Sequence, residues 1–84
     1  MTKEKFLKLQ IGMYITDKNL PVEQLVCSDF YVITGFNKNR VCYQPLWSDG
    51  NVNSKKLAFS EPFDNIDLAH ALHASDFREK IAIG

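Results

Sequence analysis

Hydrophobic and polar residues alternate near the N-terminus of the chain, between residues 8 and 16. The apolar positions are Leu9, Ile11, Met13 and Ile15, and the intervening positions carry Gln, Gly, Tyr and Thr. A period of two residues is typical of a strand with one buried face, so we expect a β-strand here. Residues 2–9 predict the start of a short helix. Residues 17–29 predict a long loop in which Pro21 begins one helical turn.

The segment from about residue 30 to residue 59 is rich in aromatic and β-branched residues. Two turn signals divide it into three stretches, the first at Lys38-Asn39 and the second at Asp49-Gly50. Asp-Gly favours the positive φ angles of a two-residue type I′ hairpin. We therefore expect a three-stranded antiparallel meander.

The two turns also set a predicted register. Lys38-Asn39 sets Phe36 opposite Val41 and Phe30 opposite Trp47, and Asp49-Gly50 sets Trp47 opposite Val52, Tyr43 opposite Lys56 and Val41 opposite Ala58. A three-residue turn at residues 37–39 is the alternative, and it shifts the first strand by one residue. With either turn, both faces of the meander carry apolar side chains. A further element has to shield the face that stays outside the first core.

The C-terminal part of the chain changes to a helical period. Asp64 predicts the cap of a helix that runs to about Ala74, with Ile66, Leu68, Ala69 and Leu72 on one broad side. Ser75 or Asp76 predicts the cap of a second, shorter helix in which Phe77 and Ile81 are stacked four residues apart. Residues 80–83 fit a strand equally well. We expect the helical tail to cover the meander.

Length and charge narrow the class of protein. The 84 residues are enough for one domain, which we place at residues 1–84, and the 45% of hydrophobic residues argues against disorder. Ten basic and ten acidic residues balance, which argues against a dedicated nucleic-acid binder. No signal peptide pattern and no run of membrane-spanning length occurs, and Cys27 and Cys42 lack CxxC spacing. We expect a cytoplasmic protein with reduced thiols and no membrane partner.

The order of these elements resembles that of the SH3-like small barrels. The stretch LKLQIGMYIT is similar to their opening strand, FYVITGF, RVCYQPL and KKLAF to the next three strands, and EPFDNI to the closing turn. The resemblance implies a fold that is α+β, mainly antiparallel β, with an SH3-like small barrel at about 7–63 and a helical C-terminal segment at about 64–83. It also implies a binding module for peptides, proteins, RNA or DNA. The acidic loop and aromatic groove of signalling SH3 domains are not matched, which disfavours proline-rich peptides.

The residue types that carry catalysis or metal binding do not form a convincing site. His70 and His73 are three residues apart, but only Asp67 and Asp76 are near enough in sequence to complete a metal site. Neither cysteine has a flanking catalytic signature, and the four glycines are scattered singly rather than forming a phosphate loop. We predict no enzyme, no cofactor and no metal. A histidine-based metal site is the least favoured hypothesis.

The candidate partner-binding surface combines aromatic and basic side chains: Tyr31, Lys38, Arg40, Tyr43, Trp47, Lys55 and Lys56. Ten aromatic residues and a net charge of zero favour a small regulatory or interaction protein that binds another protein. A homodimer is the simplest form of such binding, and a small phage or accessory protein that docks on a larger one fits the size. The alternative is a single-stranded nucleic-acid binder that stacks bases between cations. The structural alternative is that Trp47 closes one end of the core while Lys55 and Lys56 protect a strand edge.

Overall fold

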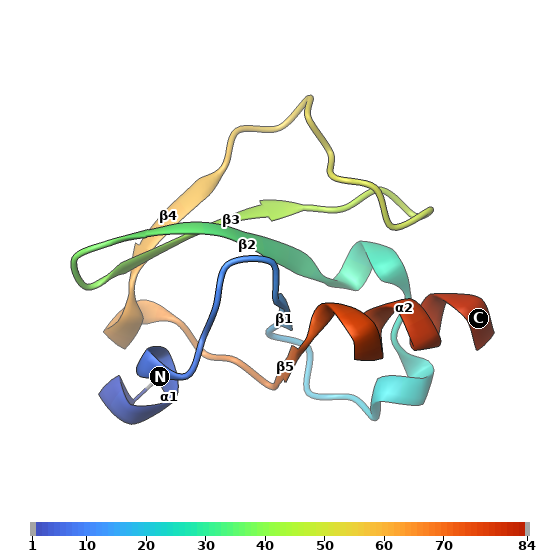
Figure 1. Cartoon of the computed structure of the whole chain (residues 1–84), viewed down its shortest axis with the longest axis horizontal. Coiled ribbons are helices and arrows are strands. Elements are labelled where there is room, and N and C mark those ends of the chain that lie inside the picture. The colour runs from blue at the N-terminus through green and yellow to red at the C-terminus, as the bar shows by residue number, and fades with distance from the viewer. Residues whose placement is uncertain (1, 84) are drawn as a thin grey trace.

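The computed structural model describes residues 2–83, with side chains through residue 80. Its elements are α1 (Lys3–Leu7), β1 (Tyr14–Thr16), η1 (Val22–Gln24), η2 (Cys27–Asp29), β2 (Tyr31–Asn37), β3 (Arg40–Pro45), β4 (Phe59–Pro62), η3 (Phe63–Asn65), β5 (His70–Leu72) and α2 (Ala74–Ile83), where η denotes a 3-10 helix. The five strands form one antiparallel sheet in the order β4-β3-β2-β1-β5 (Figure 1). The predicted α+β class with mainly antiparallel strands is confirmed. Over residues 2–83 no pairing joins β4 to β5, so the sheet is open.

The sheet has a hydrophobic core on each face. One cluster joins Ile15, Ile33 and Val41 of the strands to Phe6 of α1 and to Leu9, Met13 and Ile66. The other joins Val32 to Phe77 of α2 and to Leu25, Phe30 and Leu46. The alternation of side chains along each strand explains this division, because neighbours such as Val32 and Ile33 point to opposite faces. The prediction that the central strands are apolar on both sides, with the tail covering one side, is confirmed.

The N-terminal segment is only partly the strand that its alternation predicts. Met13 and Ile15 are buried, but Ile11 is 67% exposed and β1 begins only at Tyr14. A turn precedes the strand, in which the Met13 N–H donates to the Gln10 carbonyl at 3.1 Å. Gly12 has a φ of 92°, which disfavours any other residue in this turn. The expected short helix is present as α1, and the Thr2 hydroxyl caps it by accepting from the Lys5 N–H.

The first hairpin of the meander has the two-residue turn that the sequence predicts. Asn37 pairs with Arg40, and Phe36 lies opposite Val41, as expected. The register then shifts between Ile33 and Gly35, where a β-bulge inserts one residue. Beyond the bulge Tyr31 pairs with Pro45, so the predicted pairing of Phe30 with Trp47 is wrong.

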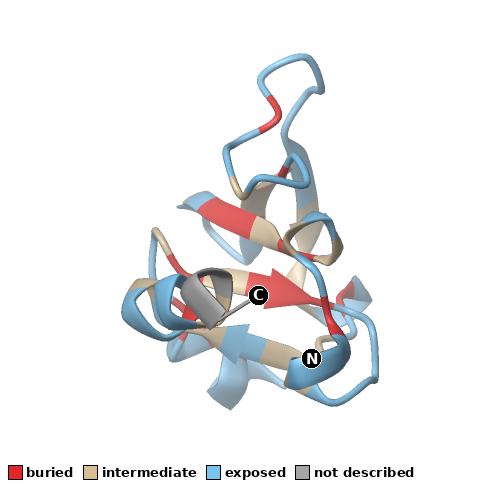
Figure 2. Cartoon of the chain, turned by 90° about the vertical axis from the view of Figure 1, so that its right-hand side faces the viewer, coloured by how far each residue is buried: buried red, intermediate tan, exposed pale blue. Residues whose placement is uncertain are grey.

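The second hairpin differs more from its prediction. Its loop has three residues rather than two: the Trp47 N–H donates to the Asn51 carbonyl at 2.7 Å, and Gly50 alone has the positive φ, 89°. Within residues 2–83, β3 next pairs with β4 from Phe59 onward, with Tyr43 opposite Phe59 and Val41 opposite Glu61. The predicted pairs of Tyr43 with Lys56 and Val41 with Ala58 are therefore wrong by three residues. Residues 53–58 form a loop that protrudes from the sheet, as the upper part of Figure 1 and the exposed segment at the top of Figure 2 show.

The predicted helix from Asp64 to Ala74 is wrong. This segment forms η3 and then β5, which pairs antiparallel with β1 through Tyr14–Leu72, Ile15–Ala71 and Thr16–His70. The segment forms a strand because β1 otherwise leaves backbone donors and acceptors unpaired at the sheet edge. The polar residues of this segment also have low helix propensity. The second predicted helix is confirmed as α2, although it begins at Ala74, before the predicted caps Ser75 and Asp76, and the strand alternative for residues 80–83 is wrong. The proposed stacking of Phe77 on Ile81 lies outside the described side chains.

Candidate functional site

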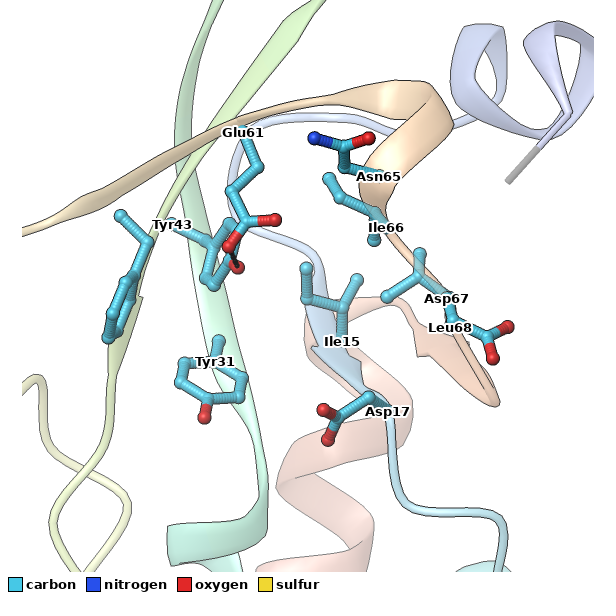
Figure 3. A pocket seen from close by; sticks show the side chains of 10 residues that line it. Ile15, Asp17, Tyr31, Tyr43, Glu61, Asn65, Ile66, Asp67 and Leu68 are labelled. Carbon is cyan, nitrogen blue, oxygen red and sulfur yellow. Dashed lines mark hydrogen bonds between the residues drawn. The ribbon is translucent and has the colours of Figure 1, made fainter.

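An open cavity of about 250 Å³ lies on the α1 side of the sheet, where β1 to β4 meet the segment after η3 (Figure 3). Its walls are aromatic and acidic. They consist of Tyr31, Tyr43 and Phe59, of Asp17, Glu61 and Asp67, and of Ile15, Asn65, Ile66 and Leu68. Lys, Arg and His are absent from these ten lining residues.

The three aromatic side chains form one cluster, which we call the aromatic cluster: Tyr31, Tyr43 and Phe59. The rings of Tyr43 and Phe59 are stacked at 5.4 Å between centroids, and Tyr31 meets both edge-on, at 5.2 Å and 5.9 Å. Tyr43 and Phe59 are cross-strand partners, and the bulge in β2 keeps Tyr31 on the same face. Phe59 stays 42% exposed, so the cluster presents an aromatic surface beside the cavity.

Carboxylates surround this cluster. The Tyr43 hydroxyl donates to Glu61 Oε1 at 3.2 Å. Burial, the negative charge of Glu61 and this hydrogen bond together raise the pKa of Tyr43 to about 12, with smaller contributions from Tyr31 and Asp17. Figure 3 shows the carboxylates of Asp17 and Glu61 on the same side as the tyrosine rings, whereas that of Asp67 points away. Two negative charges therefore lie beside the aromatic cluster.

The seven residues of the predicted partner-binding surface do not form one surface. Tyr31 and Tyr43 lie together in the cavity wall. Arg40 lies at the far end of β3, on the opposite face of the sheet from Tyr43. Its Nε donates to the Ser60 hydroxyl at 3.1 Å and its Nη2 to the Ser60 carbonyl at 2.8 Å. The basic side chains thus do not alternate with the aromatic ones.

The remaining predicted residues lie in turns and loops. Lys38 occupies the first hairpin turn with a φ of 56°, and Lys55 and Lys56 are exposed in the protruding loop. Trp47 is 42% exposed at the second hairpin, so the expectation that it closes one end of the core is wrong. Lys55 and Lys56 do not protect a strand edge either, because neither residue belongs to a strand.

The two histidines and two cysteines belong to the residue types most often found in metal sites. The His70 Nε2 donates to the Leu20 carbonyl at 2.6 Å and so ties β5 to the loop that follows β1. Within the described part of the chain, no group of three or more His, Cys, Asp or Glu side chains could hold a metal ion. Cys27 and Cys42 are both half-buried free thiols.

Sequence reasoning missed three members of the site, namely Phe59, Glu61 and Asp17. The predicted register put Phe59 on the face away from Tyr43, and Glu61 lay beyond the end of the predicted strand. The signal that could have placed Phe59 and Glu61 is the run Phe59–Pro62, in which two apolar residues flank Ser and Glu. No local signal marks Asp17.

The chain matches no protein-family model, no curated protein and no solved structure. None of the helices within residues 2–83 combines the length and the apolar character that crossing a bilayer requires.

Proposed function

We propose that the chain is a small, non-catalytic interaction module that binds another protein through the aromatic cluster. The observation that carries this proposal is the exposed Phe59 ring, stacked on Tyr43 at the rim of an open cavity. Tyrosine and phenylalanine are enriched at protein interfaces, where an aromatic anchor in a desolvated pocket supplies much of the binding energy.

An SH3-like fold is part of the same proposal. The strand order β4-β3-β2-β1-β5 supports it, as do the long connection from β1 to β2 and the 3-10 turn η3 between β4 and β5. Fold likeness of this kind raises the expectation of a binding module but does not select its ligand. A cytoplasmic location also belongs to the proposal, with the free thiols of Cys27 and Cys42 as its support.

The nucleic-acid alternative receives no support from the geometry. Stacking platforms for single strands combine aromatic rings with cations that attract phosphate. Here the rings of Tyr31 and Tyr43 lie beside Asp17 and Glu61, which repel phosphate, and the predicted cations lie elsewhere. The geometry therefore favours protein binding over nucleic-acid binding.

The test compares three forms of the tagged chain in nuclease-treated lysate of the source organism: wild type, Phe59→Ala and Val52→Ala. Val52 is a matched control, because it is also 42% exposed and lies outside the cavity. We expect at least one protein to be retained by wild type and by Val52→Ala, and to fall at least tenfold with Phe59→Ala. Circular dichroism of each variant checks that the fold is kept, and the mass in solution detects a homodimer as the partner. The proposal fails if no retained protein, including a second copy of the chain, depends on Phe59.

A further inference from the structure

The cavity beside the aromatic cluster is lined by acidic but not by basic side chains. The whole chain has no net charge, yet the ten lining residues include three carboxylates and no basic side chain. The negative charge is therefore concentrated locally rather than spread over the molecule.

Basic side chains on neighbouring segments lie outside the lining of this cavity, and Lys5 adjoins Asp67 and Leu68 in a separate pocket. Lys18 follows Asp17 in the chain, but its Nζ pairs with Asp29 Oδ1 at 2.5 Å. Arg40 is held by the hydroxyl and the carbonyl of Ser60. Neither neutralises the cavity from within, since neither is among its lining residues. A basic group that enters from another molecule would therefore meet carboxylates and no resident cation among the ten lining residues.

The aromatic rings favour the same kind of ligand as the carboxylates. The face of an aromatic ring carries negative electrostatic potential and attracts an ammonium or a guanidinium group within about 6 Å. A carboxylate beside the ring then forms a charge-assisted hydrogen bond with the same group. Tyr43 and Phe59 supply the rings, and Glu61, which accepts from Tyr43, is fixed between them and the segment after η3 (Figure 3).

The size of the cavity favours a single side chain over a whole cofactor. Pockets for drug-sized ligands typically occupy about 300–1,000 Å³, and this cavity has about 250 Å³. It is also open to solvent, so a group carried on a protein surface can enter while its backbone stays outside.

We propose that this cavity receives a basic side chain, arginine or lysine, from the partner protein, with Glu61 and Asp17 as its counter-charges and the aromatic cluster as its stacking surface. This inference rests on the proposed function, because it names the chemistry of the partner that the aromatic cluster binds. The ligand that we expect in the cavity is thus a cationic side chain on a folded or extended segment of the partner protein.

The first experiment uses a small probe and needs no identified partner. N-acetyl-arginine methylamide is titrated into the ¹⁵N-labelled chain at low salt, with N-acetyl-citrulline methylamide as the neutral isostere. We expect amide shifts at residues 15–17, 31, 43 and 59–61 with the arginine probe, and an affinity at least fivefold lower for the citrulline probe. Glu61→Gln keeps the acceptor for Tyr43 but removes the charge, and should weaken the arginine probe at least threefold. Glu23→Gln is the matched control, because Glu23 is exposed and lies outside the cavity. Equal binding of the two probes, or an unchanged affinity in Glu61→Gln, would overturn the inference.

A second experiment separates this inference from the proposed function. The protein captured by the wild-type chain is measured again with Glu61→Gln and with Phe59→Ala. Loss with both variants supports both statements. Loss with Phe59→Ala and full retention with Glu61→Gln keeps the protein-binding function and refutes the basic side chain. Retention by both variants refutes both.

Discussion

The contact of α2 with the second face of the sheet gives the sharpest prediction about stability. Phe77 is only 1% exposed, and its ring is stacked on Tyr14 at 3.8 Å between centroids and meets Phe30 edge-on at 5.3 Å. It belongs to the core cluster that covers this face, together with Leu25 and Val32. Replacing Phe77 with alanine removes the ring that joins the helix to the sheet.

The expected loss follows from the burial of this ring. Truncating a buried phenylalanine to alanine costs about 3–5 kcal/mol, since it combines the lost transfer free energy with the cavity left behind. A domain of this length has a total free energy of unfolding of roughly 4–13 kcal/mol, at about 0.05–0.15 kcal/mol per residue. Phe77→Ala therefore removes a large part of the stability. With a urea m-value of about 1 kcal/mol/M, the unfolding midpoint falls by roughly 3–5 M.

Urea unfolding followed by far-UV circular dichroism measures this change. Leu57→Ala serves as the control, because Leu57 is 90% exposed, and its effect should stay within about 0.5 kcal/mol. Phe77→Leu keeps most of the apolar volume and should lose less than about 1.5 kcal/mol, which preserves the test if the alanine variant does not fold. A loss below about 1 kcal/mol in Phe77→Ala, with an unchanged m-value, would show that α2 does not close this face.

Two further predictions concern the hairpin and the cavity. Lys38 has a φ of 56°, so Lys38→Gly should raise the free energy of unfolding by about 1 kcal/mol. A lower free energy of unfolding, measured in urea, would contradict backbone strain at this position. The pKa of Tyr43 is raised to about 12, so its native contribution to stability is complete below pH 10 and falls as pH rises from 10 to 12. Absorbance at 295 nm should show one late-ionising tyrosine, which is lost in Tyr43→Phe. If the late-ionising signal keeps its full amplitude in Tyr43→Phe, its assignment to Tyr43 is wrong.

The fold was predictable where a local signal agreed with the tertiary pairing. The two-residue turn at Lys38-Asn39 set Phe36 opposite Val41, and the period of the tail placed Phe77 on the apolar side of α2. The bulge before Gly35 was not predictable, because the residues around Thr34 have no distinguishing pattern. The helix expected after Asp64 failed for a non-local reason: β1 takes this segment as its second neighbour, at about 55 residues' distance in sequence.

The candidate site was predictable only in part, since it depends on the register of β4. Tyr31 and Tyr43 were identified from residue type and strand position. Phe59 and Glu61 could not be placed, because the chain makes an excursion after Asn53 that delays pairing by three residues relative to a regular hairpin. Asn53 is itself buried, and its backbone N–H donates to the Pro45 carbonyl at 2.9 Å, so this excursion is anchored at its base.

That anchored excursion makes residues 54–57 a suitable place for engineering. These residues are exposed, and their backbone lies away from the sheet, the cavity and α2 (Figure 1). Each doubling of the length of a flexible loop costs only about 0.6 kcal/mol, so a peptide tag or a reporter inserted here should leave the molecule intact. Such an insertion offers an immobilisation point outside the strands and α2.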